Sequence, residues 1–149
     1  MNELKQLLQD VKDQYHRVII INEENSEPYK KFCKDNKIQV LNLSAKLSEL
    51  VAGLTADDKP MEAWDKLKDW MSNQRDTILA FDNIDYLFSP EVGIIDPIKN
   101  FNYYSRDKQV IIVFIKARKR NNLLIYSEEG NEDYSELDIT NNEGFVLGW

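Results

Sequence analysis

The sequence contains very little cysteine and histidine. Among its 149 residues, Cys33 is the one cysteine and His16 the one histidine. A disulfide within the chain needs two cysteines, so it is excluded, and a zinc site built on cysteine thiolates is excluded as well. The residues next to His16 in the sequence include no nucleophile motif, which argues against a catalytic triad. We therefore expect neither transition-metal nor triad chemistry.

Long hydrophobic runs are also absent. No apolar segment approaches the roughly 20 residues that cross a bilayer, and the first residues lack the cationic segment and apolar run of a signal peptide. We therefore expect no membrane partner and a cytoplasmic location, which the lone cysteine also favours. The 42% hydrophobic and 30% charged residues are typical of a globular protein, and the length predicts a single domain over residues 1–149.

Basic residues are absent from the C-terminal part of the chain. Residues 1–120 contain all 19 lysines and arginines, and residues 121–149 contain 7 acidic residues and no basic one. An acidic segment repels nucleic acid and suits a basic partner surface. The same segment is also typical of a solvated surface that keeps a protein soluble.

Runs of apolar residues alternate with segments of helical periodicity. Strands are predicted at residues 17–22, 37–43, 76–82 and 109–115, with more exposed strands at 134–140 and 144–149. Helices are predicted at residues 3–15, after Ser26 and Pro28, after an N-cap at Ser44, and from Asp57 or Asp58 onward. This alternation favours an α/β fold, a three-layer sandwich with a mainly parallel central sheet.

Two aromatic groups have alternative interpretations. Trp64 and Trp70 are expected in the core, where Met61, Leu67 and Met71 share a helix with them. The second group joins aromatic residues to a cation on a predicted helix: Phe101, Tyr103, Tyr104 and Arg106. It suits either stacking on nucleic-acid bases or core packing with one exposed tyrosine.

Three predicted strands end in polar residues. The first ends at Asn22-Glu23-Glu24, the third at Asp82 and the fourth at Lys116. Parallel sheets carry their chemistry at the carboxyl ends of their strands. The arrangement resembles a P-loop nucleotide-binding domain, in which the first strand leads into the phosphate loop and Asp82 is the acid that holds magnesium. Asn83, next to Asp82, cannot act as a base, so Asp85, two residues after Asn83, is a second catalytic candidate.

The expected phosphate loop has no glycine. Residues 23–31 read EENSEPYKK, and Lys30-Lys31 is not followed by Ser or Thr. Glycine lets backbone amides approach phosphate, and the lysine and hydroxyl complete the motif. Here Glu23, Glu24 and Glu27 lie where a phosphate would bind, and each like-charge contact at about 4 Å costs on the order of 1–4 kcal/mol. We therefore expect a degenerate nucleotide site with no cofactor.

The same strand ends permit a receiver-like signalling domain. Glu23, Glu24, Asp82 and Lys116 suit its acids and its lysine. The 62 residues between Ile20 and Asp82 exceed what a compact receiver uses. A second feature also argues against a receiver: Lys116 follows the fourth strand, where a receiver has its hydroxyl residue.

The segment KARKR, residues 116–120, contains four cations: Lys116, Arg118, Lys119 and Arg120. They suit contact with a phosphate backbone. They also suit an arginine supplied to the site of a neighbouring subunit. The third interpretation is a solvated loop.

The whole chain resembles the small P-loop-containing BrxF component of type 3 BREX phage-defence systems. The resemblance rests on total size, on RVIIIN near residue 17, and on ILAFDNIDYLF followed by QVIIVFIKAR. It implies an AAA-like or STAND-like core with a Walker B-like acid at Asp82. It also implies antiviral defence within a protein complex whose partners are other defence proteins, with a homo-oligomer as an option and DNA reached indirectly. An active ATPase is the alternative, with Mg-ATP on Asp82 and on Lys30 or Lys31.

Overall fold

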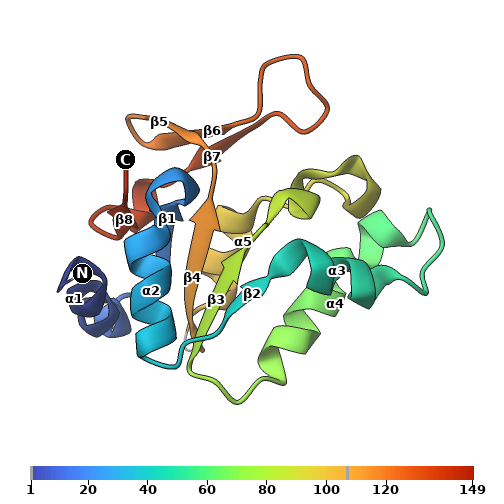
Figure 1. Ribbon diagram of the computed structural model, residues 1–149. Coiled ribbons are helices and arrows are strands. Elements are labelled where there is room, and N and C mark those ends of the chain that lie inside the picture. The colour runs from blue at the N-terminus through green and yellow to red at the C-terminus, as the bar shows by residue number, and fades with distance from the viewer. Residues whose placement is uncertain (1, 107) are drawn as a thin grey trace.

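The computed structural model describes residues 2–106 and 108–149, and its centre is a five-stranded parallel sheet (Figure 1). The strand order is β2-β3-β4-β1-β8, and every neighbouring pair is parallel. All residues of β1 and β4 are buried, as expected for β-branched runs covered on both faces. The strands are β1 (Val18–Asn22), β2 (Val40–Asn42), β3 (Ile78–Asp82), β4 (Val110–Ile115) and β8 (Val146–Leu147).

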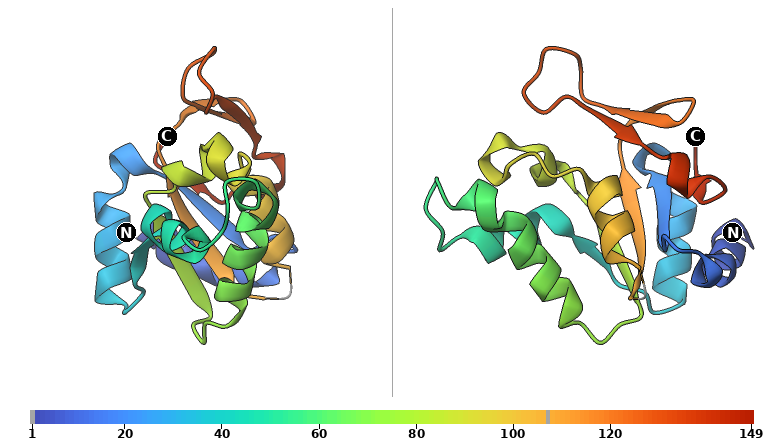
Figure 2. Two further views of the ribbon diagram at one scale, coloured as in Figure 1. Left: turned by 90° about the vertical axis from the view of Figure 1, so that its right-hand side faces the viewer. Right: turned by 180° about the vertical axis from the view of Figure 1, so that it is seen from behind.

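Helices cover both faces of this sheet, which confirms the predicted three-layer sandwich (Figure 2). Helices α1 (Asn2–Asp10) and α2 (Glu27–Asp35) pack on one face, where Ile19 and Ile21 of β1 point. The alternate residues Val18 and Ile20 point to the other face. That face is covered by α3 (Leu43–Val51), α4 (Lys59–Ser72) and α5 (Pro97–Tyr104).

A second, three-stranded antiparallel sheet lies over the carboxyl ends of the central strands (Figure 1). Its strands are β5 (Arg118–Arg120), β6 (Leu123–Tyr126) and β7 (Ser135–Asp138). Of the strands in the C-terminal part, β7 and β8 were predicted, at 134–140 and 144–149, and no strand was expected at 118–126. Leu124, Tyr126 and Leu137 join the core of the α3–α5 face, so the two sheets share one hydrophobic core.

Short 3-10 turns connect several of these elements. They are η1 (Val11–Asp13), η2 (Glu23–Asn25), η3 (Asp85–Phe88), η4 (Pro90–Val92) and η5 (Thr140–Asn142). Within the described parts of the chain, no helix has the length and apolar character needed to cross a membrane.

Some local predictions were wrong. The helix predicted at residues 3–15 ends at Asp10, and Tyr15 lies beyond it with 64% of its surface exposed. Asn42, not Ser44, caps α3, because its side chain accepts a hydrogen bond from Ala45 N at 2.9 Å. Met61 is 78% exposed because the buried face of α4 runs through Ala63, Leu67 and Met71 at a spacing of four.

The predictions for the aromatic residues hold better. Trp64 and Trp70 pack, partly buried, against the core. On α5, Phe101 and Tyr104 are buried whereas Tyr103 is 71% exposed. This matches core packing with one exposed tyrosine.

Candidate functional site

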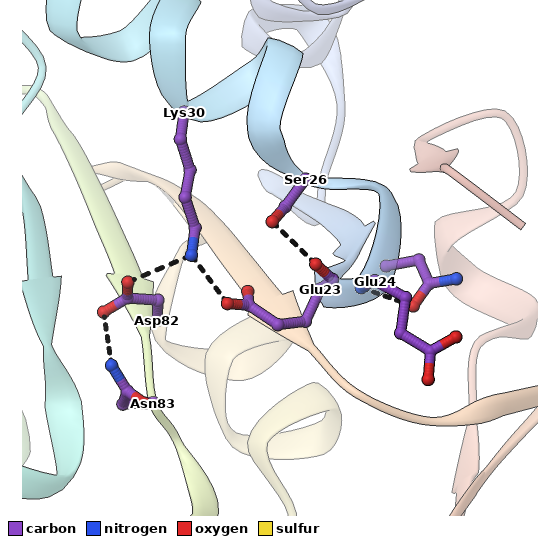
Figure 3. A network of polar contacts seen from close by, with 7 residues as sticks. Glu23, Glu24, Ser26, Lys30, Asp82 and Asn83 are labelled. Carbon is purple, nitrogen blue, oxygen red and sulfur yellow. Dashed lines mark hydrogen bonds and ion pairs between the residues drawn. The ribbon is translucent and has the colours of Figure 1, made fainter.

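Lys30, Glu23 and Asp82 meet at the carboxyl edge of the central sheet (Figure 3). Lys30 Nζ lies 2.6 Å from Glu23 Oε1 and 3.2 Å from Asp82 Oδ2. Lys30 comes from α2, which follows β1, and Asp82 ends β3, so the lysine must span β4, which lies between those strands. Its ammonium lies 5.3 Å from the ring centre of Phe114 in β4. The fold thus joins the end of β3 to the start of α2, as the strand-end prediction requires.

The loop between β1 and α2 is a tight turn. Asn22 Oδ1 accepts a hydrogen bond from Glu24 N at 3.2 Å, which begins the 3-10 turn η2. Ser26 is buried and donates its hydroxyl proton to the carbonyl of Glu23 at 2.7 Å. These contacts direct the Glu23 side chain toward Lys30. A glycine-rich loop would leave its amides open to an anion, whereas here a side-chain carboxylate occupies the space beside the lysine.

The electrostatics of the three side chains keep the lysine charged. Burial lowers the pKa of Lys30, but its hydrogen bonds to Glu23 and Asp82 and their negative charges raise it, and the net pKa lies above the ordinary value. The Lys30, Glu23 and Asp82 side chains are 23%, 32% and 18% exposed, so solvent screens them only partly. Glu23 Oε2 is buried without a hydrogen-bond donor from the described residues.

Lys31, the other predicted phosphate ligand, does not join this group. Its side chain is 77% exposed and pairs with Asp35 at 2.9 Å, one helical turn further along α2. Residues 30 and 31 point about 100° apart on a helix, so only one of them can face the sheet. The structure therefore distinguishes Lys30, which faces the sheet, from Lys31, which faces solvent. The sequence alone did not distinguish them.

Asp85 also faces away from Lys30. Its carboxylate accepts a hydrogen bond from the Tyr126 hydroxyl at 2.7 Å. Burial raises the pKa of Tyr126, and so do the hydrogen bond and the charge of Asp85, so the phenol stays a proton donor.

Asn83 has a positive φ of 48°, and its side-chain amide donates a hydrogen bond to Asp82 Oδ1 at 3.3 Å. This left-handed residue turns the chain after β3 toward the second sheet.

A cavity of about 400 Å³ lies beside Asp85, against the second sheet. Its lining combines both charges, and includes Glu24, Asp85, Lys116, Arg118 and Tyr126. Lys119 lines a different hollow, together with Trp149. Side chains alternate between the two faces of a strand, so the cations of residues 116–120 do not share one surface.

Magnesium does not fit Asp82 in this arrangement. Asp82 Oδ2 contacts Lys30, and Oδ1 accepts from Asn83. Magnesium favours octahedral oxygen coordination with several waters, and a lysine ammonium repels it. Among the residues that the structure describes, no three His, Cys, Asp or Glu side chains gather as a metal site.

The C-terminal residues hold the β1–α2 loop, and no pattern in the sequence predicted this contact. The carbonyl of Gly148 accepts hydrogen bonds from Asn22 Nδ2 at 3.0 Å and Asn25 Nδ2 at 2.6 Å. Trp149 Nε1 donates to the carbonyl of Ala117, after β4, at 2.8 Å. Gly148 has a φ of 92° and approaches Asn22 closely, so this position favours glycine.

Comparisons with protein-family models, with curated proteins and with solved structures find no match. The chemistry of the site is therefore inferred from its geometry. A lysine neutralised by two carboxylates holds neither a free base nor an activated nucleophile. The two ion pairs of Lys30 connect α2 to the β1–α2 loop and to the end of β3.

Proposed function

We propose that this chain is a non-catalytic P-loop-like domain that acts by protein–protein contact in a cytoplasmic phage-defence complex. The proposal of a closed nucleotide site rests on one observation: Glu23 lies 2.6 Å from Lys30, the lysine that would otherwise bind phosphate. The assignment to a defence complex is supported by the resemblance of RVIIIN, ILAFDNIDYLF and QVIIVFIKAR to the BrxF family. The proposed partners are other defence proteins, with DNA reached through them.

The closed site is supported by the energetic cost of opening it. A triphosphate would bring several negative charges next to Glu23 and Asp82, at on the order of 1–4 kcal/mol for each like-charge contact. Displacing Glu23 would break its ion pair with Lys30. The loop has no glycine whose amides would offset this cost.

An active ATPase is the alternative function. It would need Lys30 to leave both carboxylates, Asp82 to take magnesium, and Arg118 or Arg120 to reach a neighbouring subunit. The receiver alternative is less well supported, because receiver-type sheets have the strand order 2-1-3-4-5. The order here is β2-β3-β4-β1-β8.

Thermal unfolding with millimolar Mg-ATP tests the closed site. We expect no rise in the melting temperature of the wild-type protein, because a ligand stabilises only when its concentration exceeds its dissociation constant. The Glu23→Ala variant removes the carboxylate beside Lys30 and should show a rise, whereas Glu27→Ala, which removes an exposed carboxylate at the start of α2, should not. A rise in the wild type that Asp82→Ala abolishes would establish the ATPase instead.

The proposed complex is tested separately. We expect the chain to co-elute in size-exclusion chromatography with proteins encoded beside its gene, and those neighbours to include a methyltransferase and a large helicase-like ATPase. A gene without such neighbours, or a chain that elutes alone after co-expression with them, would contradict the defence assignment. This outcome would leave the result on nucleotide binding unchanged.

A further inference from the structure

A cluster of tyrosines and cations lies at the amino edge of the central sheet, opposite the site described above. We call it the amino-edge cluster, and it consists of Tyr15, Arg17, Tyr103, Arg106 and Lys108. Arg106 Cζ lies 4.4 Å from the ring centre of Tyr15 and 4.8 Å from that of Tyr103. The guanidinium is therefore sandwiched between two rings that come from different segments of the chain.

The cluster is fixed by contacts to the residues that begin β1 and follow α5. Arg17 N donates to the buried Ser105 hydroxyl at 2.8 Å, and Arg17 Nη1 donates to the Lys108 carbonyl at 3.4 Å. His16 Nδ1 lies 3.3 Å from the carbonyl oxygen of Asn102. These contacts hold the two segments side by side, so the rings and cations are already arranged before any partner binds.

The cluster has exposed rings and unsatisfied donors. Tyr15 is 64% exposed and Tyr103 is 71% exposed. The Nε atoms of Arg17 and Arg106 are buried and find no hydrogen-bond acceptor among the described residues. Such donors are rare in native proteins. The acid Asp107, which lies outside the described residues, separates Arg106 from Lys108 in the sequence. The ion pairs of the described residues include none of the cluster's three cations.

A hollow of about 420 Å³ continues the cluster along the sheet edge. Lys108 belongs to both, and the hollow is also lined by Arg75, Thr77, Gln109 and the acid Asp76. Arg75 adds a fourth cation to this edge.

We infer that the amino-edge cluster binds single-stranded nucleic acid directly, whereas duplex DNA is reached through the partner proteins of the proposed function. The phosphates would contact Arg17, Arg106 and Lys108, and unpaired bases would stack on the outward faces of Tyr15 and Tyr103. Exposed aromatic rings next to cations are the combination that single-strand-binding surfaces use. A duplex keeps its bases paired and would leave the rings unused, whereas an acidic protein segment would use only the cations. Because the whole chain carries a net charge of -7, the affinity depends on local contacts and is sensitive to salt.

Fluorescence anisotropy of a short labelled oligothymidylate at low salt tests this inference. We expect wild-type binding that Tyr103→Ala weakens by roughly 5-fold to 100-fold, the range typical of removing one stacking ring. Arg106→Gln should weaken binding and reduce the slope of log K against log salt by about 0.7 for each phosphate that the variant no longer neutralises. Lys66→Gln is the control, since Lys66 is an exposed cation of α4 that belongs neither to the cluster nor to residues 116–120.

Competition identifies the class of ligand. We expect unlabelled single strand to displace the probe at much lower concentration than a duplex of the same length or poly-L-glutamate. Stronger competition by poly-L-glutamate would assign the cluster to acidic protein segments and overturn the inference. Absence of binding would overturn it as well, as would equally weakened binding in Lys66→Gln and Tyr103→Ala variants that keep the wild-type circular dichroism spectrum. None of these results depends on whether the carboxyl-edge site binds nucleotide.

Discussion

Lys30 neutralises two carboxylates that would repel each other without it. Replacing it by methionine keeps the length of the side chain and removes the charge, so Glu23 and Asp82 remain close together without a cation. Loss of one partner of a buried ion pair costs about 3–5 kcal/mol, and the partial exposure here reduces this to about 1–3 kcal/mol. We predict that urea denaturation of Lys30→Met shows such a loss in the free energy of unfolding.

Lys31→Met is the control for that variant, because the Lys31–Asp35 pair is exposed. Its effect should stay within about 0.5 kcal/mol. The difference between wild type and Lys30→Met should also depend on pH. The folded pKa of Lys30 is raised, so its contribution is complete below the unfolded pKa of about 10.4 and is lost as the pH rises through the folded value. A difference that stays constant through this range would contradict the ion-pair explanation.

At the residue scale, the sequence identified the carboxyl edge but not all of its contacts. Glu23 and Asp82 were predicted there because strand ends of a parallel sheet meet, and Lys30 was one of two lysines named in the expected phosphate loop. The Asp85–Tyr126 hydrogen bond joins residues 41 positions apart. Periodicity within a segment carries no information on such pairs, so this contact and the turn of Asp85 away from Lys30 became visible only in three dimensions.

At the scale of elements, β-branched content decided which strands were predictable. Strands β1 and β4 are uninterrupted apolar runs that are buried on both faces. Strand β5 is Arg-Lys-Arg with every residue exposed, and its neighbour β6 follows after two asparagines. Polar edge strands such as β5 lack the alternation that predicts a strand. Strand β6 is an apolar and largely buried run of four residues, so it was a signal in the sequence that the prediction missed. The N-cap of α3 was misplaced by two residues for a similar reason: Asn42 and Ser44 are both good caps, and Ser44 instead accepts from Tyr86 N at 3.0 Å.

Gly93 joins η4 to the start of α4 through a close backbone contact. Its φ is 88°, and a Cβ atom would lie 2.8 Å from the carbonyl oxygen of Pro60. Gly130 has a similar φ of 96° but no atom within 4 Å of the same position. We predict that Gly130→Ala costs about 1 kcal/mol of stability for the left-handed backbone alone, and that Gly93→Ala costs about 2–4 kcal/mol. Chemical denaturation of both variants measures the difference, and equal losses of stability would show that the Pro60 contact yields easily.

At the scale of the whole molecule, the two sheets form one hydrophobic core. The three-layer arrangement was predictable from the alternation of strands and helices. The position of the second sheet was not, because it depends on stacking between residues distant in the chain. The Phe88 and Tyr126 rings stack with their centres 3.7 Å apart and an interplanar angle of 13°. This pair links η3, which follows β3, to β6 of the second sheet.

Tyr126 therefore couples the second sheet to the rest of the protein. We predict that Tyr126→Ala, which removes both the stacking and the hydrogen bond to Asp85, costs about 3–5 kcal/mol. Amides of β5–β7 should then exchange with solvent faster than those of β1 and β4, because the second sheet can open while the central sheet stays folded. Tyr126→Phe keeps the ring and should cost only about 0.5–1.5 kcal/mol. Hydrogen exchange on both variants measures this, and an equal increase of exchange in both sheets would mean that the molecule opens only as a single unit.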